Sequence, residues 1–287
     1  MKRTLKSVWS PERRNRRDVD VYLPASYRAA GPRRYPVVYM QDGQNLSDPA
    51  TAFAGTWDLE PTLERLAARG LEMIVVGVHH AGEERLVEYS PFPDRRLGGG
   101  EGESYLAFLV DTLKPRIDRM FRTRTHCDET AILGSSMGAL ISLYAFFRHP
   151  SVFGRAGVMS PSVWFGQGAI LDYIAAAKAP GGRVYLDVGM REGAGTLRQA
   201  RQLARLLVRK GFRRDRRALR RRDEPHAFLP RQARMALSWP KRRSAASKLP
   251  PRGAAASQLR YVEDPGGGHQ EAAWTHRLEG ALDFLID

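Results

Sequence analysis

The stretch Gly134-Ser135-Ser136-Met137-Gly138 places one serine between two glycines, with apolar runs directly before it and after it. A serine at a sharp turn from a strand into a helix presents its hydroxyl to a substrate, and the two glycines leave room for that turn. The spacing alone also fits an ordinary glycine-rich turn, but the flanking apolar runs favour a nucleophile. We therefore predict that Ser136 attacks a carbonyl carbon.

A serine hydroxyl needs a base within hydrogen-bond reach. In hydrolases built on such a turn, the chain order is serine, acid, histidine. His269 follows the last apolar run on a glycine-rich loop, so we predict that it takes the proton from Ser136 and returns it to the leaving group. The remaining histidines that we considered fit this order less well: His79, His80, His226 and His276.

The third catalytic position needs a carboxylate that orients the base and stabilises its charged form. Glu192 stands on the loop after the apolar run 183–188, where this acid is expected. Asp187, inside that run, is an alternative, and a serine–histidine pair without an acid is another. A solvated loop position would also explain Glu192.

The tetrahedral intermediate needs donors for its oxyanion. The backbone N–H of Met137 is one, because it follows the nucleophile at the start of a helix. The second is expected on the loop after an early strand, where the N–H of Gln44 or Gly43 is the candidate. An ordinary turn around Asp42-Gly43 is the alternative.

These residues need a scaffold of alternating strands and helices. Short apolar or alternating runs predict strands at 17–23, 36–40, 73–78, about 132, 155–160, 183–188 and 259–262. Helical spacing predicts helices at 59–71, 104–121 with Ser104 as N-cap, 139–149, 170–177, 197–208 and 272–286. Such alternation indicates an α/β fold with a mostly parallel sheet and helices on both faces, and sites at the carboxyl ends of strands.

The chain resembles the putative esterase family of α/β-hydrolases, which contains enterochelin-esterase-like and carbohydrate-esterase-like proteins. The matching segments are 39–46, 84–91, 134–138, 160–164 and 265–274. The resemblance implies a three-layer α/β/α sandwich and a serine ester hydrolase, with Ser136 and His269 as nucleophile and base. The chain departs from the family where residues 212–257 extend a connection that is usually short.

Within the matching segments, three side chains are candidate substrate contacts: Arg85, Tyr89 and Trp164. Arg85 would suit an acidic acyl group, although an internal pair of Arg85 with Glu88 would explain it equally well. Trp57, Trp164 and Trp274 are candidates for an acyl or aromatic pocket, with simple packing as the alternative.

The net charge of +15 is concentrated in one segment. Residues 209–252 hold 16 Lys or Arg and 3 Asp or Glu, which leaves a net charge of +2 on the remaining residues. This distribution argues against a nucleic-acid-binding domain. We expect a single domain over 1–287, with a flexible basic insertion at 212–257. Docking of this insertion to nucleic acid or another anionic surface, and an out-of-frame sequence, are alternatives.

Several classes of protein are disfavoured. There is no run of about 18 apolar residues for a membrane span and no apolar core of a secretory signal near the N-terminus. Cys127 is the only cysteine, which fits a cytoplasmic location and gives no support for a metal site beside His126. We expect a cofactor-free esterase acting on a small-molecule ester. An acyltransferase with the same residues and a non-catalytic binding protein are the alternatives.

Overall fold

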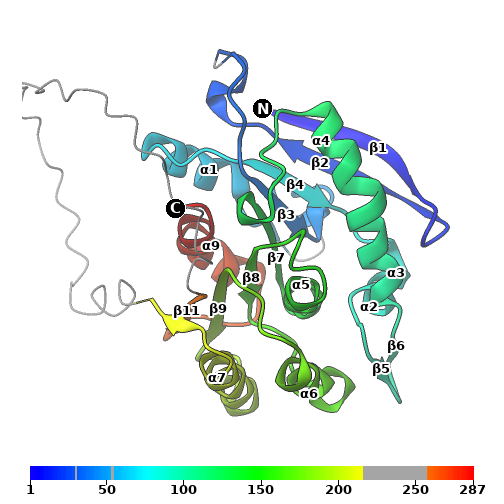
Figure 1. The fold of residues 1–287 in the computed structure, drawn as a ribbon, viewed down its shortest axis with the longest axis vertical. Helices are drawn as coiled ribbons and strands as arrows, with labels where there is room; N and C mark the ends of the chain where they lie inside the picture. Colours follow the sequence, from blue (N-terminus) through cyan, green and yellow to red (C-terminus); the bar gives the residue numbers. More distant parts are fainter. Residues whose placement is uncertain (30, 53–54, 216–256) are drawn as a thin grey trace, which may run out of the picture.

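A computed structural model describes residues 1–29, 31–52, 55–215 and 257–287 (Figure 1). Its centre is a nine-stranded sheet in the order β1-β2-β4-β3-β7-β8-β9-β11-β10. The strands of this sheet are β1 (Lys2–Ser10), β2 (Asn15–Tyr22), β3 (Val37–Gln41), β4 (Ile74–Val78), β7 (Thr130–Ser135), β8 (Arg155–Met159), β9 (Arg183–Gly189), β10 (Arg213–Arg214) and β11 (Gln258–Asp264). The pairings β1–β2 and β2–β4 are antiparallel, and the others are parallel.

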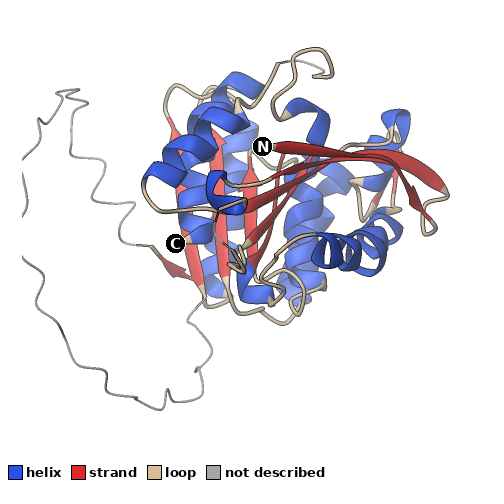
Figure 2. Cartoon of the chain, turned by 90° about the horizontal axis from the view of Figure 1, so that it is seen from above, coloured by secondary structure: helices blue, strands red, loops and turns tan. Residues whose placement is uncertain are grey.

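Helices cover both faces of this sheet, as the view from above shows (Figure 2). The apolar stripes of α1 (Leu59–Ala68) and α9 (Glu271–Ile286) pack together on one face. The other face is covered by α5 (Met137–Arg148), α6 (Ala169–Ala176) and α7 (Ala194–Arg209), together with the segment that runs from α3 to α4. The predicted three-layer arrangement with a mostly parallel sheet is therefore confirmed.

The remaining elements are short. They are α2 (Arg85–Glu88), α3 (Gly102–Ala107), a π-helical stretch (Phe108–Leu113), α4 (Lys114–Met120), the hairpin of β5 (Pro93–Asp94) with β6 (Gly98–Gly99), and 3-10 turns at Ala25–Tyr27, Gly43–Asn45, Gly82–Glu84, Cys127–Glu129 and Phe165–Gly168. In the part of the chain described by the structure, no helix has the length and apolar character needed to cross a membrane.

The structure corrects three expectations about elements. Strand β1 is absent from the predicted elements, because Lys2–Ser10 has neither a continuous apolar run nor a regular alternation of polar and apolar residues. The helix expected to be capped by Ser104 begins earlier, with Glu101 at the N-cap and Gly102 as its first residue. The start of the predicted insertion belongs to the fold, because Phe212 is buried and β10 pairs with β11. Residues 216–256, the rest of that insertion, lie outside the described residues.

The topology gathers the chemistry-bearing loops at one edge of the sheet. The parallel strands β3, β7, β8, β9 and β11 all end at this edge. The loop after β3 carries the predicted oxyanion donors, and Ser136, Glu192 and His269 follow β7, β9 and β11. Loops at the carboxyl ends of parallel strands commonly form the site in open α/β sheets.

Candidate active site

Ser136 occupies a strained turn between β7 and α5. Its backbone has φ of 55° and ψ of −120°, which is disfavoured for a residue with a Cβ atom. A Cβ on Gly134 would lie 2.5 Å from the carbonyl carbon of Gly138, so glycine is needed where strand and helix meet. A Cβ on Gly138 would lie 3.0 Å from that of Gln41. The two flanking glycines therefore serve close packing, as the motif predicts.

His269 connects the serine to a carboxylate. Its Nε2 atom lies 3.0 Å from Ser136 Oγ, and its Nδ1 atom lies 2.8 Å from Glu192 Oε2. Both distances are in the range for hydrogen bonds between a nucleophile, its base and the group that orients the base. The imidazole edge packs on Trp274, with ring centroids 5.1 Å apart, and 43% of the His269 side chain is exposed. This arrangement leaves the ring reachable by water.

Glu192 is buried, yet its surroundings favour the charged form. Burial alone would raise the pKa of its carboxyl group, but hydrogen bonds from His269, the Ser160 hydroxyl and the Gly189 N–H outweigh it and lower the pKa. The Gly189 N–H lies 2.7 Å from Glu192 Oε1. A negative charge is thereby held against His269 Nδ1.

Asp187, the alternative acid, lies elsewhere in the site. Its side chain is fully buried, and its Oδ1 accepts hydrogen bonds from Arg277 Nη1 at 2.8 Å and from the Ser160 N–H at 3.0 Å. Burial raises the pKa of Asp187 to about 7, although the charge of Arg277 opposes the rise. The structure thus brings Glu192 to His269 and pairs Asp187 with Arg277.

The loop after β3 is held in a strained conformation beside α2. Asp42 has a left-handed backbone with φ of 55°, and its N–H donates to the Tyr89 hydroxyl at 3.0 Å. Arg85 forks onto both carboxylate oxygens of Asp42 at 2.7 and 2.9 Å. At Gly43, a Cβ would lie 2.5 Å from the backbone of Gly77, so only glycine fits this approach. The loop is therefore more than a simple Asp-Gly turn.

These contacts correct two of the predictions for the 84–91 segment. Arg85 pairs with Asp42 and not with Glu88. Tyr89 was predicted as a substrate contact, but it is fully buried and holds the backbone of Asp42. Arg85 itself stays partly exposed and remains a predicted contact.

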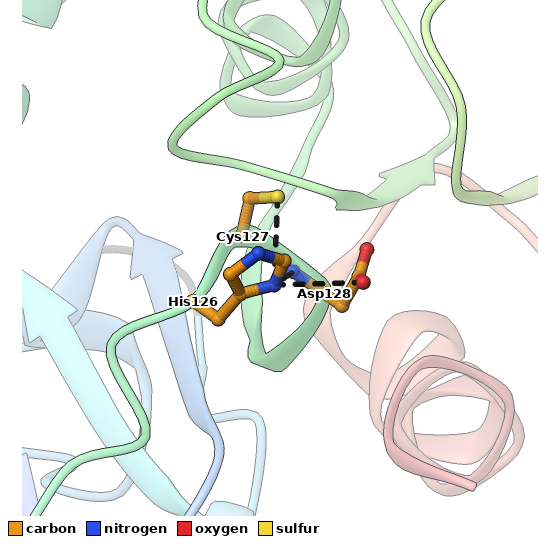
Figure 3. A group of neighbouring side chains, drawn as sticks. All are labelled: His126, Cys127 and Asp128. Carbon is orange, nitrogen blue, oxygen red and sulfur yellow. Dashed lines mark hydrogen bonds and ion pairs between the residues drawn. The ribbon is translucent and has the colours of Figure 1, made fainter. Parts of the chain in front are cut away.

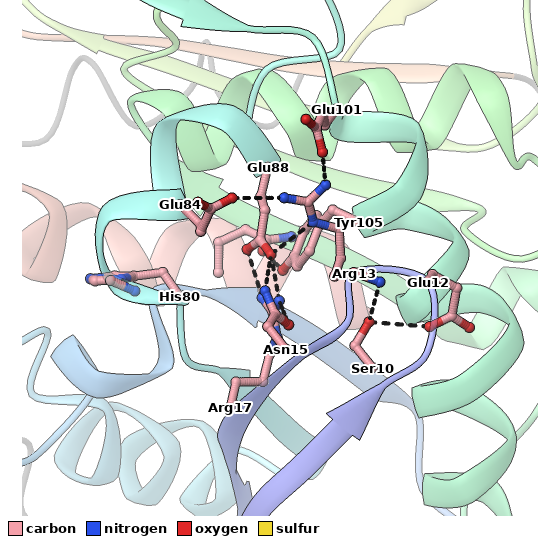
Figure 4. A network of polar contacts seen from close by, with 12 residues as sticks. Ser10, Glu12, Arg13, Asn15, Arg17, His80, Glu84, Glu88, Glu101 and Tyr105 are labelled. Atoms are coloured by element: carbon pink, nitrogen blue, oxygen red, sulfur yellow. Dashed lines mark hydrogen bonds and ion pairs between the residues drawn. The ribbon is translucent and has the colours of Figure 1, made fainter.

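Glu88 fastens α2 to the N-terminal hairpin, in the network of Figure 4. Arg17 donates two hydrogen bonds to its carboxylate, at 2.6 and 2.8 Å, and both side chains are fully buried. Burial would raise the pKa of Glu88, but this pairing and the bonds from Asn15 and Arg13 lower it. Helix α2, which contacts the loop after β3 through Arg85, is thus itself anchored to β2.

The structure adds residues that sequence reasoning missed. Ser162 Oγ lies 3.1 Å from Ser136 Oγ, and the Ser162 N–H donates to the Ser136 carbonyl. The only sequence signal for Ser162 is that segment 160–164 belongs to the family resemblance. Trp164, two residues on, is 48% exposed and remains a predicted substrate contact. Trp57 and Trp274 are buried against each other, which corrects the idea that they line a pocket.

A possible metal-binding group lies at the other end of β7. His126, Cys127 and Asp128 offer ligand atoms within 4.8 Å of one another (Figure 3). They are consecutive residues on a turn that precedes β7, whereas Ser136 follows that strand. Their contacts are local, including the Asp128 N–H to His126 Nδ1 at 3.3 Å. The hydrogen-bonded chain of Glu192, His269 and Ser136 includes none of these three residues.

Comparison with known proteins places this chain in a family. A family model described as "Putative esterase" matches residues 10–285. The chain belongs to this family. Uncharacterized protein YbbA of Bacillus subtilis is 28% identical over 251 residues, which cover 82% of this chain and 96% of that protein. An endo-1,4-beta-xylanase/feruloyl esterase of Xylanibacter ruminicola is 28% identical over 54% of this chain and 21% of that protein.

Solved structures show the same fold at low sequence identity. The BES protein from Bacillus cereus has a TM-score of 0.67 and 18% identity, covering 100% of this chain and 95% of that one. The enterobactin esterase FES from Shigella flexneri has a TM-score of 0.70 and 17% identity, covering 99% of this chain and 59% of that one. As a member of the putative esterase family, the chain is a carboxylic ester hydrolase.

Proposed function

We propose that this putative esterase cleaves a small-molecule carboxylic ester through an acyl-Ser136 intermediate, with His269 as base and Glu192 as acid. The observation that carries the proposal is the continuous hydrogen-bonded chain from Glu192 Oε2 through both His269 nitrogens to Ser136 Oγ. The contact of His269 with Ser136 is short enough for proton transfer, and the contact with Glu192 orients the imidazole.

The reaction has two halves. His269 Nε2 removes the proton of Ser136 Oγ as the oxygen attacks the ester carbon, and Glu192 stabilises the imidazolium that results. When the tetrahedral intermediate collapses, the imidazolium protonates the leaving alcohol and the acyl group stays on Ser136. His269 then deprotonates a water molecule as the water oxygen attacks the acyl carbon. The imidazolium returns that proton to Ser136 Oγ as the bond to the acyl group breaks, which releases the carboxylic acid and restores the serine.

The oxyanion of each intermediate needs two preorganised donors. We assign the N–H of Met137, at the N-terminal end of the 12-residue helix α5, and an N–H of Gly43 or Gln44. The second assignment is supported by the loop after β3, which Tyr89 and Arg85 hold from the side of α2.

Substrate contacts come from residues that remain accessible near the serine. Trp164 is exposed two residues after Ser162, whose hydroxyl touches Ser136 Oγ. We assign it to an apolar or aromatic part of the ester. Relatives named for feruloyl and enterobactin ester hydrolysis support a small-molecule substrate of this kind.

Hydrolysis is favoured over acyl transfer by the exposure of the base. The side chain of His269 is 43% exposed, so water can reach the imidazole ring. The complete serine–histidine–glutamate arrangement also argues against a fold that only binds ligands. With an added alcohol acceptor, we expect the free acid to remain the main product.

The test is hydrolysis of p-nitrophenyl acetate by the Ser136→Ala variant. We expect kcat to fall by about 10³-fold or more, as when other serine hydrolases lose the nucleophile. Ser142→Ala is the matched control, because Ser142 is a buried serine of α5 whose hydroxyl has no hydrogen-bond partner in the described part of the chain. Wild-type turnover by Ser136→Ala would refute the assignment.

A further inference from the structure

The oxygen of Glu192 that His269 does not use faces a buried polar cluster. We call Ser160, Asp187, Trp274 and Arg277 the acid-support cluster. Ser160 and Asp187 are fully buried, and the side chain of Arg277 is 4% exposed. These residues come from the end of β8, from β9 and from α9, so three separate elements meet behind the acid.

The hydrogen of the Ser160 hydroxyl has only one available direction. Trp274 Nε1 lies 3.1 Å from Ser160 Oγ and Arg277 Nη2 lies 3.2 Å from it, and both groups can only donate. They therefore occupy the two acceptor positions of the hydroxyl. Its single hydrogen is left for Glu192 Oε1, which is the third partner of this oxygen.

The backbone of Ser160 is also held in an unusual conformation. Its φ is 46°, a left-handed value that a residue with a Cβ rarely adopts. The Ser160 N–H contacts both the carbonyl and the carboxylate of Asp187, at 3.1 and 3.0 Å. Glycine would adopt this backbone conformation with less strain. The serine at this position instead supplies a hydroxyl that makes three hydrogen bonds.

Arg277 supplies the positive charge of the cluster. Its guanidinium lies 2.8 Å from Asp187 Oδ1, 3.6 Å from Glu192 Oε1 and 3.6 Å from Asp264 Oδ2. A guanidinium stays charged in proteins. A buried carboxylate keeps its negative charge only when cations and hydrogen-bond donors compensate for the lost water.

The same helix positions the base. His269 lies two residues before the start of α9, and Trp274 and Arg277 stand three residues apart on it, so they share a face. When this face of α9 packs against Ser160, it therefore positions His269 and also the two side chains, Trp274 and Arg277, that bind Ser160 behind Glu192.

We propose that Ser160 and Arg277 are positioning residues, which hold Glu192 charged through its Oε1 and keep its Oε2 aimed at His269 Nδ1. This inference rests on the proposed triad. Neither residue touches the reacting atoms, so their removal should lower kcat and leave KM almost unchanged.

The first test is a double-mutant cycle between Ser160 and Glu192, read as kcat on p-nitrophenyl acetate. Loss of a hydrogen bond to a charged group predicts a drop of roughly 10- to 100-fold for Ser160→Ala in the wild-type background. In the Glu192→Ala background, the same change should have little further effect. An equal drop in both backgrounds would overturn the inference and leave the triad intact. Full activity of Glu192→Ala alone would instead refute the triad.

Ser160→Gly guards against a variant that simply fails to fold. Glycine accepts φ of 46° without strain and lacks the hydroxyl, so we expect the activity loss of Ser160→Ala together with better folding. Wild-type kcat in a folded Ser160→Gly protein would overturn the role of the hydroxyl.

The second test separates two roles of Arg277. The double variant Asp187→Asn/Arg277→Met removes both members of the ion pair, so no buried charge of that pair is left uncompensated. If Arg277 supports Glu192, kcat should fall roughly 10-fold or more while the protein stays folded, because a nearby cation is lost. If Arg277 only neutralises Asp187, kcat stays at the wild-type value, and this result would overturn the role of Arg277.

Discussion

Tyr89 is predicted to hold the oxyanion loop through a single hydroxyl. Its oxygen accepts the N–H of Asp42 at 3.0 Å, and both residues are buried. The change Tyr89→Phe keeps the ring and its packing on Tyr105, with centroids 5.4 Å apart, but leaves that N–H without an acceptor. The perturbation therefore removes only the hydroxyl, with its bond to the Asp42 N–H and its interaction with the Tyr105 hydroxyl.

The magnitude follows from the burial of that N–H. Leaving a buried donor unpaired costs about 1–3 kcal/mol of stability. Removal of a whole oxyanion donor lowers kcat by about 10²–10³-fold in a serine protease. The donor of this loop would be loosened and not removed, so we expect a kcat decrease of roughly 10-fold with a small change in KM.

The assay pairs urea unfolding with p-nitrophenyl acetate hydrolysis, using Tyr39→Phe as the control. Tyr39 is fully buried, and its hydroxyl has no hydrogen-bond partner among the residues that the structure describes. Its removal should change the unfolding free energy by less than about 0.5 kcal/mol, because nothing is left unpaired. If the two variants match in both stability and kcat, the anchoring role of Tyr89 is refuted.

Three other predictions concern Glu192, the sharp turn at Ser136 and unfolding at low pH. Glu192→Gln should lower kcat on p-nitrophenyl acetate by about 10³–10⁴-fold, because the amide favours the wrong tautomer of the base; a loss under 10-fold would contradict the triad. Gly134→Ala should unfold at a clearly lower urea concentration than the control Gly280→Ala. A Cβ at position 134 would lie 2.5 Å from the backbone of Gly138, whereas a Cβ at position 280 would meet open space. Equal urea midpoints for the two variants would contradict this packing. Burial would raise the pKa of the Asp20 carboxyl group, but its hydrogen bonds, of which the bond with His79 has the largest effect, lower the pKa to about 2. This stabilisation, about 2 kcal/mol, is present above pH 4 and is lost as the pH falls toward 2; Asp20→Asn should flatten that part of the stability curve measured by urea unfolding.

The local features of this protein could be predicted from its sequence. The strand runs 36–40 and 73–78 correspond to β3 and β4, since a strand buried on both faces needs a continuous apolar run. The sharp turn at Ser136 was also predictable, because it depends on the spacing of two glycines and on the apolar runs directly beside them. The chain order of Ser136, Glu192 and His269 gave a triad hypothesis, and the structure brings these three side chains within hydrogen-bond reach.

Other features depend on residues that are distant in the chain. The pairing of Arg85 with Asp42 instead of Glu88 depends on where β3 lies beside α2, which no local pattern encodes. Strand β1 forms by pairing with the edge of β2, although its own residues lack the periodicity of a strand.

The sequence by itself thus determined the fold class, the sharp turn at Ser136 and the candidate catalytic residues. Periodicity and glycine spacing are local features, and the order of residues along the chain is read directly from the sequence. Only the tertiary structure decided between Glu192 and Asp187 as the partner of His269. It also joined Ser160 with Arg277, 117 residues away, behind the acid. The reason is that these contacts depend on which strand ends and helix faces lie next to each other. The packing of the helices on the whole sheet decides this arrangement.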